Sequence, residues 1–316
     1  MLANGRKFED WIAACDRIEA PPSGKSPSLM TSIRARLLLP FLALPLMAHA
    51  APFGDNNILV WEDYTGSNSE VEGKLLAGGR VTLVNYSVGQ SLTGATQDVL
   101  VSGNSVYFVA GAVYGNLVAA NGITSQNIVY ENGGSAEAYR PGVNQTIRDQ
   151  FAFAAPLSSS LRGRAANGTT AFNSGTLTLT GTNTALNVFT VQASSLINVS
   201  NFHMNVPAGS TAVLNIRGAS ATIANATNNF DPTRTIWNFS EATSLNISGI
   251  ALNGSILAPS AAITANNGLL NGQIVGSSFY GSAQINSRNF VGAVPEPAPF
   301  LVLGVGMLAL RRRRKA

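Results

Sequence analysis

Residues 252–260 read Leu-Asn-Gly-Ser-Ile-Leu-Ala-Pro-Ser, and residues 270–278 read Leu-Asn-Gly-Gln-Ile-Val-Gly-Ser-Ser. The second stretch begins 18 residues after the first and is identical to it at five of nine positions. Looser copies occupy residues 72–82 and 114–124, and all four contain a glycine, one further residue, two apolar residues and a small residue. A turn glycine before a short apolar strand, recurring at a period of about 20 residues, is typical of a solenoid, in which each coil buries its inner side chains against neighbouring coils.

Short runs of β-forming residues fill the sequence between these copies. Two of them, residues 177–180 and 245–248, alternate apolar and polar side chains, so one side of each strand would face a core. We therefore predict an all-β chain that folds as a parallel β-helix, or β-solenoid. The alternative is a β-sandwich, because it too is built from short strands joined by Gly and Asn turns. The strands predicted between the copies are residues 176–180, 186–192, 196–206, 212–216 and 244–250.

One segment departs from the strand pattern. Between Asn144 and Arg164 apolar residues recur at helical spacing, although Pro156 should end or kink a helix there. The segment lies between the repeat copies of the two halves of the chain. We therefore predict one helix packed alongside the solenoid, either lengthwise on the coils or over one end. The apolar residues at this spacing are Ile147, Phe151, Ala154, Ala155, Leu157 and Leu161.

The N-terminal region has the three parts of a secretory signal peptide. Residues 30–36 are cationic, residues 37–47 are apolar, and Ala48 and Ala50 are the small residues of an A-x-A cleavage site. Signal peptidase is the partner that this site implies. Residues 1–29 fit no part of a signal peptide, so we predict that translation starts at Met30, that residues 30–50 are removed, and that the chain is exported.

The last 24 residues combine three features in a fixed order: a Pro-Glu-Pro sequence, an apolar run at residues 300–310, and a cluster of cations. A helix over that run would cover about 17 Å, less than the roughly 30 Å hydrocarbon core of a bilayer. The cations would hold its end on the cytoplasmic side of the membrane and the folded region on the other side. We therefore predict transient anchoring in the inner membrane through a short transmembrane helix. The residues of the pattern are Pro295, Glu296, Pro297, Arg311, Arg312, Arg313 and Arg314.

This order of features resembles the PEP-CTERM signal, which bacterial exosortases recognise and remove. The resemblance implies that residues 293–316 are a sorting segment and that exosortase is a second partner during export. It also implies that the folded region finally reaches the cell surface or the extracellular matrix.

The charge of the segment between the two signals excludes one class of function. Residues 51–293 contain nine Lys and Arg against eleven Asp and Glu, a net charge of −2, and the cations are scattered. A nucleic-acid-binding protein needs Lys and Arg gathered on one face, so we exclude that class. The only cysteine, Cys15, precedes the signal peptide, and residues 51–292 are therefore predicted to form one domain without disulfides or thiolate metal ligands.

Residues 51–292 offer few candidates for catalysis. Their one histidine, His203, lies in an alternating strand without a Gly-x-Ser-x-Gly motif, so we interpret it as a structural or surface residue. Four acids near the first repeat copy leave three interpretations open: a solvated coil, a Ca²⁺ site built from carboxylate and carbonyl oxygens, or the carboxylate pair of a glycoside hydrolase. We assign no catalytic residue and no cofactor beyond that Ca²⁺ hypothesis. The four acids are Glu62, Asp63, Glu70 and Glu72.

Aromatic and threonine side chains are the candidates for a binding surface. Sugars stack on exposed aromatic rings, but most aromatics in strands are buried, and burial is favoured for Trp237 because Ile236 and Phe239 flank it. The row of Thr176, Thr178 and Thr180 would present hydroxyls on one side of a strand. The aromatic candidates are Trp61, Tyr64, Tyr86, Tyr107, Tyr114, Tyr130, Tyr139 and Trp237.

A second resemblance rests on residues 61–79, on residues 236–245 and on the repeat at Gly254. Together they resemble the choice-of-anchor A family over most of residues 58–291. The resemblance implies an exported bacterial protein with an exchangeable C-terminal anchoring signal, of a family regarded as adhesive. The second half of the chain is also similar to the β-solenoid of bacterial ice-binding proteins, a likeness of fold that carries no function by itself.

Three hypotheses for function follow. The first is a non-enzymatic exported protein, an adhesin or structural component of a biofilm matrix, whose partners are exopolysaccharides or other surface glycans. The second is a polysaccharide-degrading enzyme on a β-helix that uses the four acids. The third is an ice- or carbohydrate-binding module with a flat Thr/Asn face, which a regular outward ladder of threonines would favour.

Overall fold

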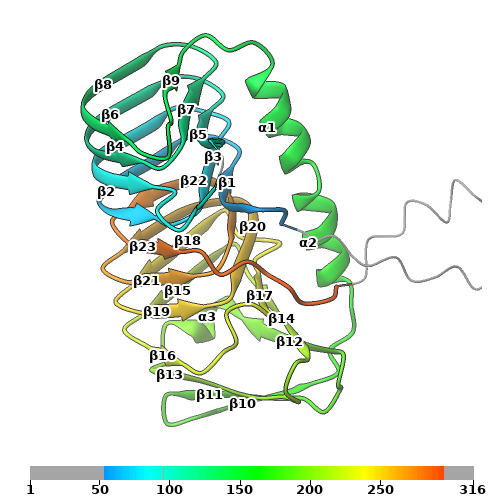
Figure 1. Cartoon of the computed structure of the whole chain (residues 1–316). Helices are drawn as coiled ribbons and strands as arrows, with labels where there is room; N and C mark the ends of the chain where they lie inside the picture. The colour runs from blue at the N-terminus through cyan, green and yellow to red at the C-terminus, as the bar shows by residue number, and fades with distance from the viewer. Residues whose placement is uncertain (1–52, 95, 295–316) are drawn as a thin grey trace, which may run out of the picture. The chain divides into compact units, whose positions relative to one another are not determined.

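The computed structural model describes residues 53–94 and 96–294, and strands make up most of this part of the chain. Successive coils pair in parallel and turn through three sheets, as Figure 1 shows. The prediction of a parallel β-helix with a helix alongside is confirmed. The β-sandwich alternative is wrong, because a sandwich joins antiparallel strands within each sheet whereas these sheets pair in parallel from coil to coil.

The first sheet faces the helices and is called the helix-side sheet. It is parallel and takes one strand from each of 10 coils. Its strands, in spatial order, are β12 (Leu186–Gln192), β14 (Thr211–Arg217), β17 (Thr235–Asn238), the first parts of β20 (Ser255–Asn266) and β22 (Ile274–Gly281), β1 (Asn56–Val60), β3 (Lys74–Ala77), β5 (Asp98–Ser102), β7 (Asn116–Ala119) and β9 (Ala136–Glu137).

The second sheet is called the ladder face. Its strands, in spatial order, are β15 (Ser220–Ala224), β18 (Ser244–Ser248), the second parts of β20 and β22, and the first parts of β2 (Tyr64–Val71), β4 (Val81–Val88), β6 (Val106–Val113) and β8 (Ile123–Tyr130). The third sheet contains β19 (Ala251–Asn253), β21 (Leu269–Asn271), β23 (Gln284–Asn286) and the last parts of β2, β4, β6 and β8.

A small four-stranded sheet continues the third sheet to one end of the stack, because β16 (Thr227–Asn228) lies beside β19 and hydrogen-bonds to it. The sheet goes on in parallel through β13 (Asn201–Asn205) and β11 (Thr176–Thr180) and ends at β10 (Thr169–Asn173), which pairs antiparallel with β11 and caps the stack. A short helix, α3 (Ala193–Leu196), lies between β12 and β13. The strand predicted over residues 196–206 is wrong in its first half, because α3 ends there in a turn in which the N–H groups of Asn198 and Val199 donate to the carbonyls of Ser195 and Leu196.

The coils do not stack in the order of the sequence. β1 pairs on one side with β22, where Ile58 lies opposite Ile274, and on the other side with β3. The first coil of the chain therefore lies directly on the last one. The helices carry the chain back along the outside of the stack, from the β9 end to the β10 end (Figure 1).

A buried glutamine holds this junction between the two halves together. Gln273 is fully buried, and its Nε2 donates to the carbonyl oxygens of Gly54 at 3.0 Å and Asn56 at 2.8 Å. Its Oε1 accepts a hydrogen bond of 2.9 Å from the N–H of Phe290. One side chain thus pairs backbone groups from both ends of the folded region, which would otherwise be buried without partners.

The repeated sequence unit is explained by its place at a corner of the coil. A Cβ on Gly272 would lie 2.5 Å from the carbonyl oxygen of Gly254 on the next coil, so the two corners stack only without side chains. The first apolar residue after the glycine, Ile256 or Ile274, points into the solenoid core. The second, Leu257 or Val275, points to the helices. The helix-side sheet is thus buried on both sides, which explains why both positions are apolar.

A second corner, within β2, β4, β6 and β8, requires a left-handed backbone. Asn68, Asn85, Ala110 and Asn127 follow one another from coil to coil there, with φ values of 52°, 49°, 58° and 56°. Asparagine tolerates this conformation better than other residues with a side chain. Asn85 also donates a hydrogen bond of 3.1 Å to the Oδ1 of Asn68, so that Ala110 interrupts a column of asparagines.

Two helices, α1 (Val143–Phe151) and α2 (Ala154–Arg162), lie lengthwise on the helix-side sheet (Figure 1). The predicted helix is interrupted at Ala152 and Phe153, and Pro156 does not break it. Pro156 occupies the first turn of α2, where a missing N–H costs no intrahelical hydrogen bond. Of the two predicted placements, the lengthwise one is confirmed.

Candidate functional site

The four candidate acids lie at the two ends of β2. Glu62 and Asp63 precede the strand, and the Oδ1 of Asp63 accepts a hydrogen bond of 2.7 Å from the N–H of Arg80. At the other end Glu70 accepts a hydrogen bond of 2.8 Å from the side chain of Gln284. Between the two pairs β2 turns a corner at Asn68, so Glu62 and Asp63 lie beside the ladder face whereas Glu70 and Glu72 lie at the third sheet. Within residues 53–94 and 96–294, no group of three or more His, Cys, Asp and Glu is placed to hold a metal ion.

Glu70 and Glu72 contribute to the junction between the two halves of the chain. The Oε2 of Glu72 accepts a hydrogen bond of 2.8 Å from the N–H of Ser287, which follows the last strand of the chain. With the bond between Glu70 and Gln284, both carboxylates of this pair join the first coil to the last.

His203 lies on β13 with its side chain exposed, next to Thr178 of β11 and away from the buried Phe202. The threonine row of residues 176, 178 and 180 lies on β11, in the small four-stranded sheet. It belongs to a single strand and does not form the ladder across coils that the hypothesis of a flat binding face requires.

Half of the eight aromatic candidates, Trp61, Tyr64, Tyr86 and Trp237, are buried or contact the helices, whereas Tyr107 and Tyr139 are exposed and Tyr114 and Tyr130 are half-buried. Trp237 is fully buried, stacks on Phe230 with ring centroids 5.3 Å apart, and donates from Nε1 to the carbonyl of Asn253 at 2.9 Å. Tyr64 and Tyr86 share a hydrogen bond of 2.7 Å between their hydroxyls, and burial raises the pKa of both. These rings stabilise the core.

The motif at Trp61 fixes helix α1. The Trp61 ring lies 5.4 Å from that of Phe151, and the guanidinium carbon of Arg148 lies 4.6 Å from the Trp61 ring centroid. This cation–π contact joins the last turn of α1 to the turn before β2.

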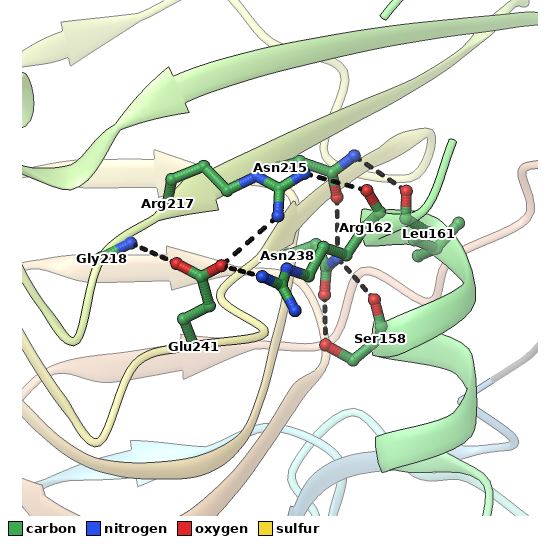
Figure 2. A network of polar contacts seen from close by, with 8 residues as sticks. All are labelled: Ser158, Leu161, Arg162, Asn215, Arg217, Gly218, Asn238 and Glu241. Atoms are coloured by element: carbon green, nitrogen blue, oxygen red, sulfur yellow. Dashed lines mark hydrogen bonds and ion pairs between the residues drawn. The ribbon is translucent and has the colours of Figure 1, made fainter. Parts of the chain in front are cut away.

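Asparagines of two neighbouring coils hold helix α2, as Figure 2 shows. The Nδ2 of Asn238 donates to the carbonyl of Ser158 at 2.9 Å and to the Oδ1 of Asn215 at 2.7 Å, and the hydroxyl of Ser158 donates back to Asn238 at 2.6 Å. Asn215 donates in turn to the carbonyl of Leu161 at 2.8 Å, in the last turn of the helix, where this carbonyl also accepts from the N–H of Arg164. Ser158, Asn215 and Asn238 are all nearly completely buried.

An ion-pair group continues this contact at the end of α2 (Figure 2). Glu241 pairs with Arg162 of the helix and with Arg217 of β14, and Arg217 also donates to the carbonyl of Arg162 at 3.1 Å. The N–H of Gly218 donates to the Glu241 carboxylate at 2.9 Å. This backbone hydrogen bond, followed by the attraction of the two arginines, holds the pKa of Glu241 below its usual value.

A cavity of about 280 Å³ lies between α1 and the helix-side sheet. Its charged groups are paired with one another: Lys74 with Asp55, and Arg140 with both Asp98 and Glu137. The hydrogen bond from Arg140 holds the pKa of Glu137 below its usual value. We therefore interpret these ion pairs as structural: they help to hold the start of α1 against the sheet.

The most regular surface of the described chain is the ladder face. Every second residue of its strands points outward, and one outward column crosses eight successive coils without a charged side chain. From the β15 end to the β8 end it consists of Thr222, Asn246, Thr264, Tyr280, Thr65, Thr82, Tyr107 and Thr124. A second outward column, of Ser67, Val84, Val109 and Gln126, runs beside it and is also uncharged.

Sequence reasoning named only Tyr107 among the residues of this ladder. Tyr280 is 62% exposed and was missed, although it follows the inward Phe279 in an alternating strand and could have been found from that alternation. The threonines were missed because they lie far apart in the sequence and become neighbours only through the register of the coils.

The predicted cleavage and sorting residues lie outside the described residues: Ala48, Ala50, Pro295, Glu296, Pro297 and Arg311 to Arg314. The apolar run at residues 300–310, predicted to be a transmembrane helix, lies outside them as well. Within the described ranges, no helix has the length and apolar character needed to cross a membrane.

Comparison with known proteins adds one family. No curated protein matches this chain. A family model described as "Putative Ice-binding-like adhesive domain" matches residues 49–287, which include all the strands and both long helices of the described residues. Because this match covers well over half of the 316 residues, the chain belongs to the family of ice-binding-like adhesive domains.

Proposed function

We propose that this chain is an exported, non-enzymatic adhesin of the cell surface or extracellular matrix. The observation that carries the proposal is the ladder face, where eight successive coils each present an uncharged side chain in register, five of them threonine. Such a surface offers many weak contacts to a repetitive partner, and weak contacts add through effective concentration when they act together. Membership in an adhesive domain family supports the same function.

The route to the surface is part of the proposal. Residues 30–50 act as a signal peptide that signal peptidase removes, and residues 293–316 act as a PEP-CTERM sorting segment that anchors the chain transiently in the inner membrane until exosortase cleaves it. The chain is thereby a choice-of-anchor A protein whose adhesive domain comprises residues 51–292. Exopolysaccharide or another surface glycan is the proposed partner.

The sorting step is tested by replacing Pro295, Glu296 and Pro297 with alanine in the producing organism. We expect uncleaved chain to accumulate in the membrane fraction and surface-exposed chain to fall at least tenfold, measured by immunoblotting and by antibody labelling of intact cells. Pro299→Ala is the matched control, because it removes a neighbouring proline outside the motif. Unchanged surface display of the triple variant would contradict sorting by exosortase.

The adhesive step is tested separately by deleting the gene and measuring attachment of cells to a biofilm matrix. We expect attachment to fall and to return when the intact gene is restored. Restoration by a chain with Glu70→Gln and Glu72→Gln is also expected, because we propose that these carboxylates are structural. If that variant restored surface display but left attachment or matrix turnover lost, the acids would have a catalytic or Ca²⁺-binding role.

A second candidate function is an ice- or carbohydrate-binding module. The column of threonines on the ladder face favours it, because hydroxyls in register across coils can order water or bind the hydroxyls of a sugar polymer. Surface adhesion and such binding are compatible, since the ladder face would supply both.

A further inference from the structure

Two exposed tyrosines interrupt the threonine column of the ladder face. Tyr107 is 45% exposed and Tyr280 is 62% exposed, and both lie in the same outward column as Thr65 and Thr82. Each tyrosine stands next to a buried phenylalanine in its strand: Phe279 precedes Tyr280, and Phe108 follows Tyr107. Because the phenylalanine points into the core, the neighbouring tyrosine must point outward. The two rings therefore leave the same side of the sheet from rigid positions.

The distance between the two rings follows from the coil register. Tyr280, Thr65, Thr82 and Tyr107 stand on four successive coils, and neighbouring strands lie about 4.8 Å apart, so the two tyrosines are about 14 Å apart along the stack. Small hydroxyl side chains occupy the two coils between them. The result is a row of four side chains with an aromatic ring at each end and two hydroxyl groups between them.

The chemistry of this row limits what it can bind. No charged side chain stands in its column or in the parallel column of Ser67, Val84 and Val109. The column on its other side carries one acid and one base, Asp63 and Arg80, so this surface has no net charge to attract an ionic ligand. Val84 is itself 36% exposed between the two rings and adds an apolar patch. Rings that offer an apolar face, with hydroxyls beside them, match a pyranose, which has apolar C–H faces and a rim of hydroxyls.

We infer that the ladder face binds an uncharged polysaccharide chain laid along the solenoid axis, with sugar rings stacked on Tyr107 and Tyr280 and sugar hydroxyls bonded to Thr65 and Thr82. The inference rests on the proposed function and names the class of its partner. The separation of the two rings is larger than one sugar, so the site selects a polymer over a monosaccharide. Ice is disfavoured as the ligand, because the two rings protrude from an otherwise flat column.

The inference is tested with the purified full chain in detergent by affinity electrophoresis in gels that contain hydroxyethylcellulose, galactomannan, dextran or alginate. We expect at least one of the three neutral polysaccharides to retard the chain and the acidic alginate to have no effect. Tyr107→Ala or Tyr280→Ala should each weaken binding about tenfold, and the double variant by more than either alone. Tyr→Phe at both positions should keep most of the binding, because the ring is retained.

Matched controls distinguish binding at this site from nonspecific binding. Phe172→Ala removes another exposed aromatic ring, on the capping strand β10, and should leave binding unchanged. Tyr107→Thr with Tyr280→Thr completes the threonine column and should abolish polysaccharide binding. Retardation that survives both alanine substitutions would overturn the inference. Binding of ice, and of no polysaccharide, by both the native chain and the double threonine variant would overturn it too.

The outcome for cells distinguishes this inference from the proposed function. If the double alanine variant loses polysaccharide binding and cells carrying it lose attachment, the inference and the adhesin function are both supported. If cells attach through the chain but the pure chain binds none of the polysaccharides, the inference is wrong and the adhesin function stands. If the pure chain binds through its tyrosines but deletion of the gene leaves attachment unchanged, the face is assigned correctly and the adhesin function is wrong.

Discussion

Ala110 adopts a backbone conformation that is unfavourable for alanine. Its φ of 58° lies in the left-handed region, in a column where the neighbouring coils carry Asn85 and Asn127. A residue with an ordinary side chain costs about 1 kcal/mol or more in that conformation, and asparagine costs less. Ala110→Asn should therefore raise the melting temperature by about 2–4 °C, as measured by calorimetry.

The control for this prediction is Ala112→Asn. Ala112 lies two residues further along β6 in ordinary strand conformation, so the same substitution should leave the melting temperature within about 1 °C. Equal stabilisation by both variants would show that the gain does not come from the backbone at residue 110.

Glu241 gives stability that depends on pH. Its folded-state pKa is held below the usual carboxyl value of about 4.3, so its stabilising effect is complete above that value and is lost as the pH falls through the folded-state pKa. Glu241→Gln should lower the melting temperature by about 2–4 °C at pH 7, the shift that about 1 kcal/mol causes in a chain of this size. The difference from the native chain should shrink below pH 4, and a constant difference down to pH 3 would contradict the ion-pair explanation.

At the level of helices and strands, the docking of α2 depends on two asparagines that look like ordinary outward polar residues in the sequence. Asn238→Ala would leave buried groups of Ser158 and Asn215 without partners. We expect a loss of about 2–4 kcal/mol in the free energy of unfolding, measured by urea titration. Amide hydrogen exchange in α2 should increase more than in β20.

Asn246→Ala is the matched substitution for Asn238→Ala. Asn246 is an exposed asparagine on the ladder face of the same half of the chain, so its removal should change the free energy of unfolding by less than about 0.5 kcal/mol. A similar loss from both variants would argue against the helix-docking role.

The strands and the helix could be predicted to different degrees. Residues 176–180 and 186–192 were predicted with the bounds that β11 and β12 have, because alternation and β-branched residues mark them locally. The repeat unit predicted the coil corners, because the close approach of Gly254 and Gly272 leaves a mark in the sequence. The break between α1 and α2 was placed wrongly at Pro156. The sequence alone does not show whether a proline lies in the first turn of a helix, where it is tolerated, or in the interior, where it breaks the helix.

The arrangement of the coils and of the candidate site could not be predicted. The pairing of β1 with β22 depends on contacts such as that from Gln273 to Asn56, which are 217 residues apart and follow no period. The four acids, prominent in the sequence, are separated along β2, and the uncharged column of the ladder face is created only when eight coils come into register.

For the complete fold, the junction between the two halves determines whether they unfold together. Gln273→Ala would leave the carbonyls of Gly54 and Asn56 and the N–H of Phe290 without partners in a buried place. We expect a loss of about 2–4 kcal/mol in the free energy of unfolding, with faster hydrogen exchange in both β1 and β22. Loss of protection in β22 alone would mean that the halves are stable independently and that Gln273 does not join them.

The position of this junction has a mechanical consequence for a surface protein. Phe53 and Phe290, near the two ends of the described chain, touch with ring centroids 5.8 Å apart, and the chain leaves this region at Val294 in the same apolar cluster. Tension on a tether at Val294 would thus load the centre of the rod and not its tip. An end coil can be peeled from one neighbour, whereas the central coil is bonded on both sides and must break two ladders at once. If the chain is held through its C-terminal segment, as we propose, the stack would lie broadside to its support and resist detachment by shear.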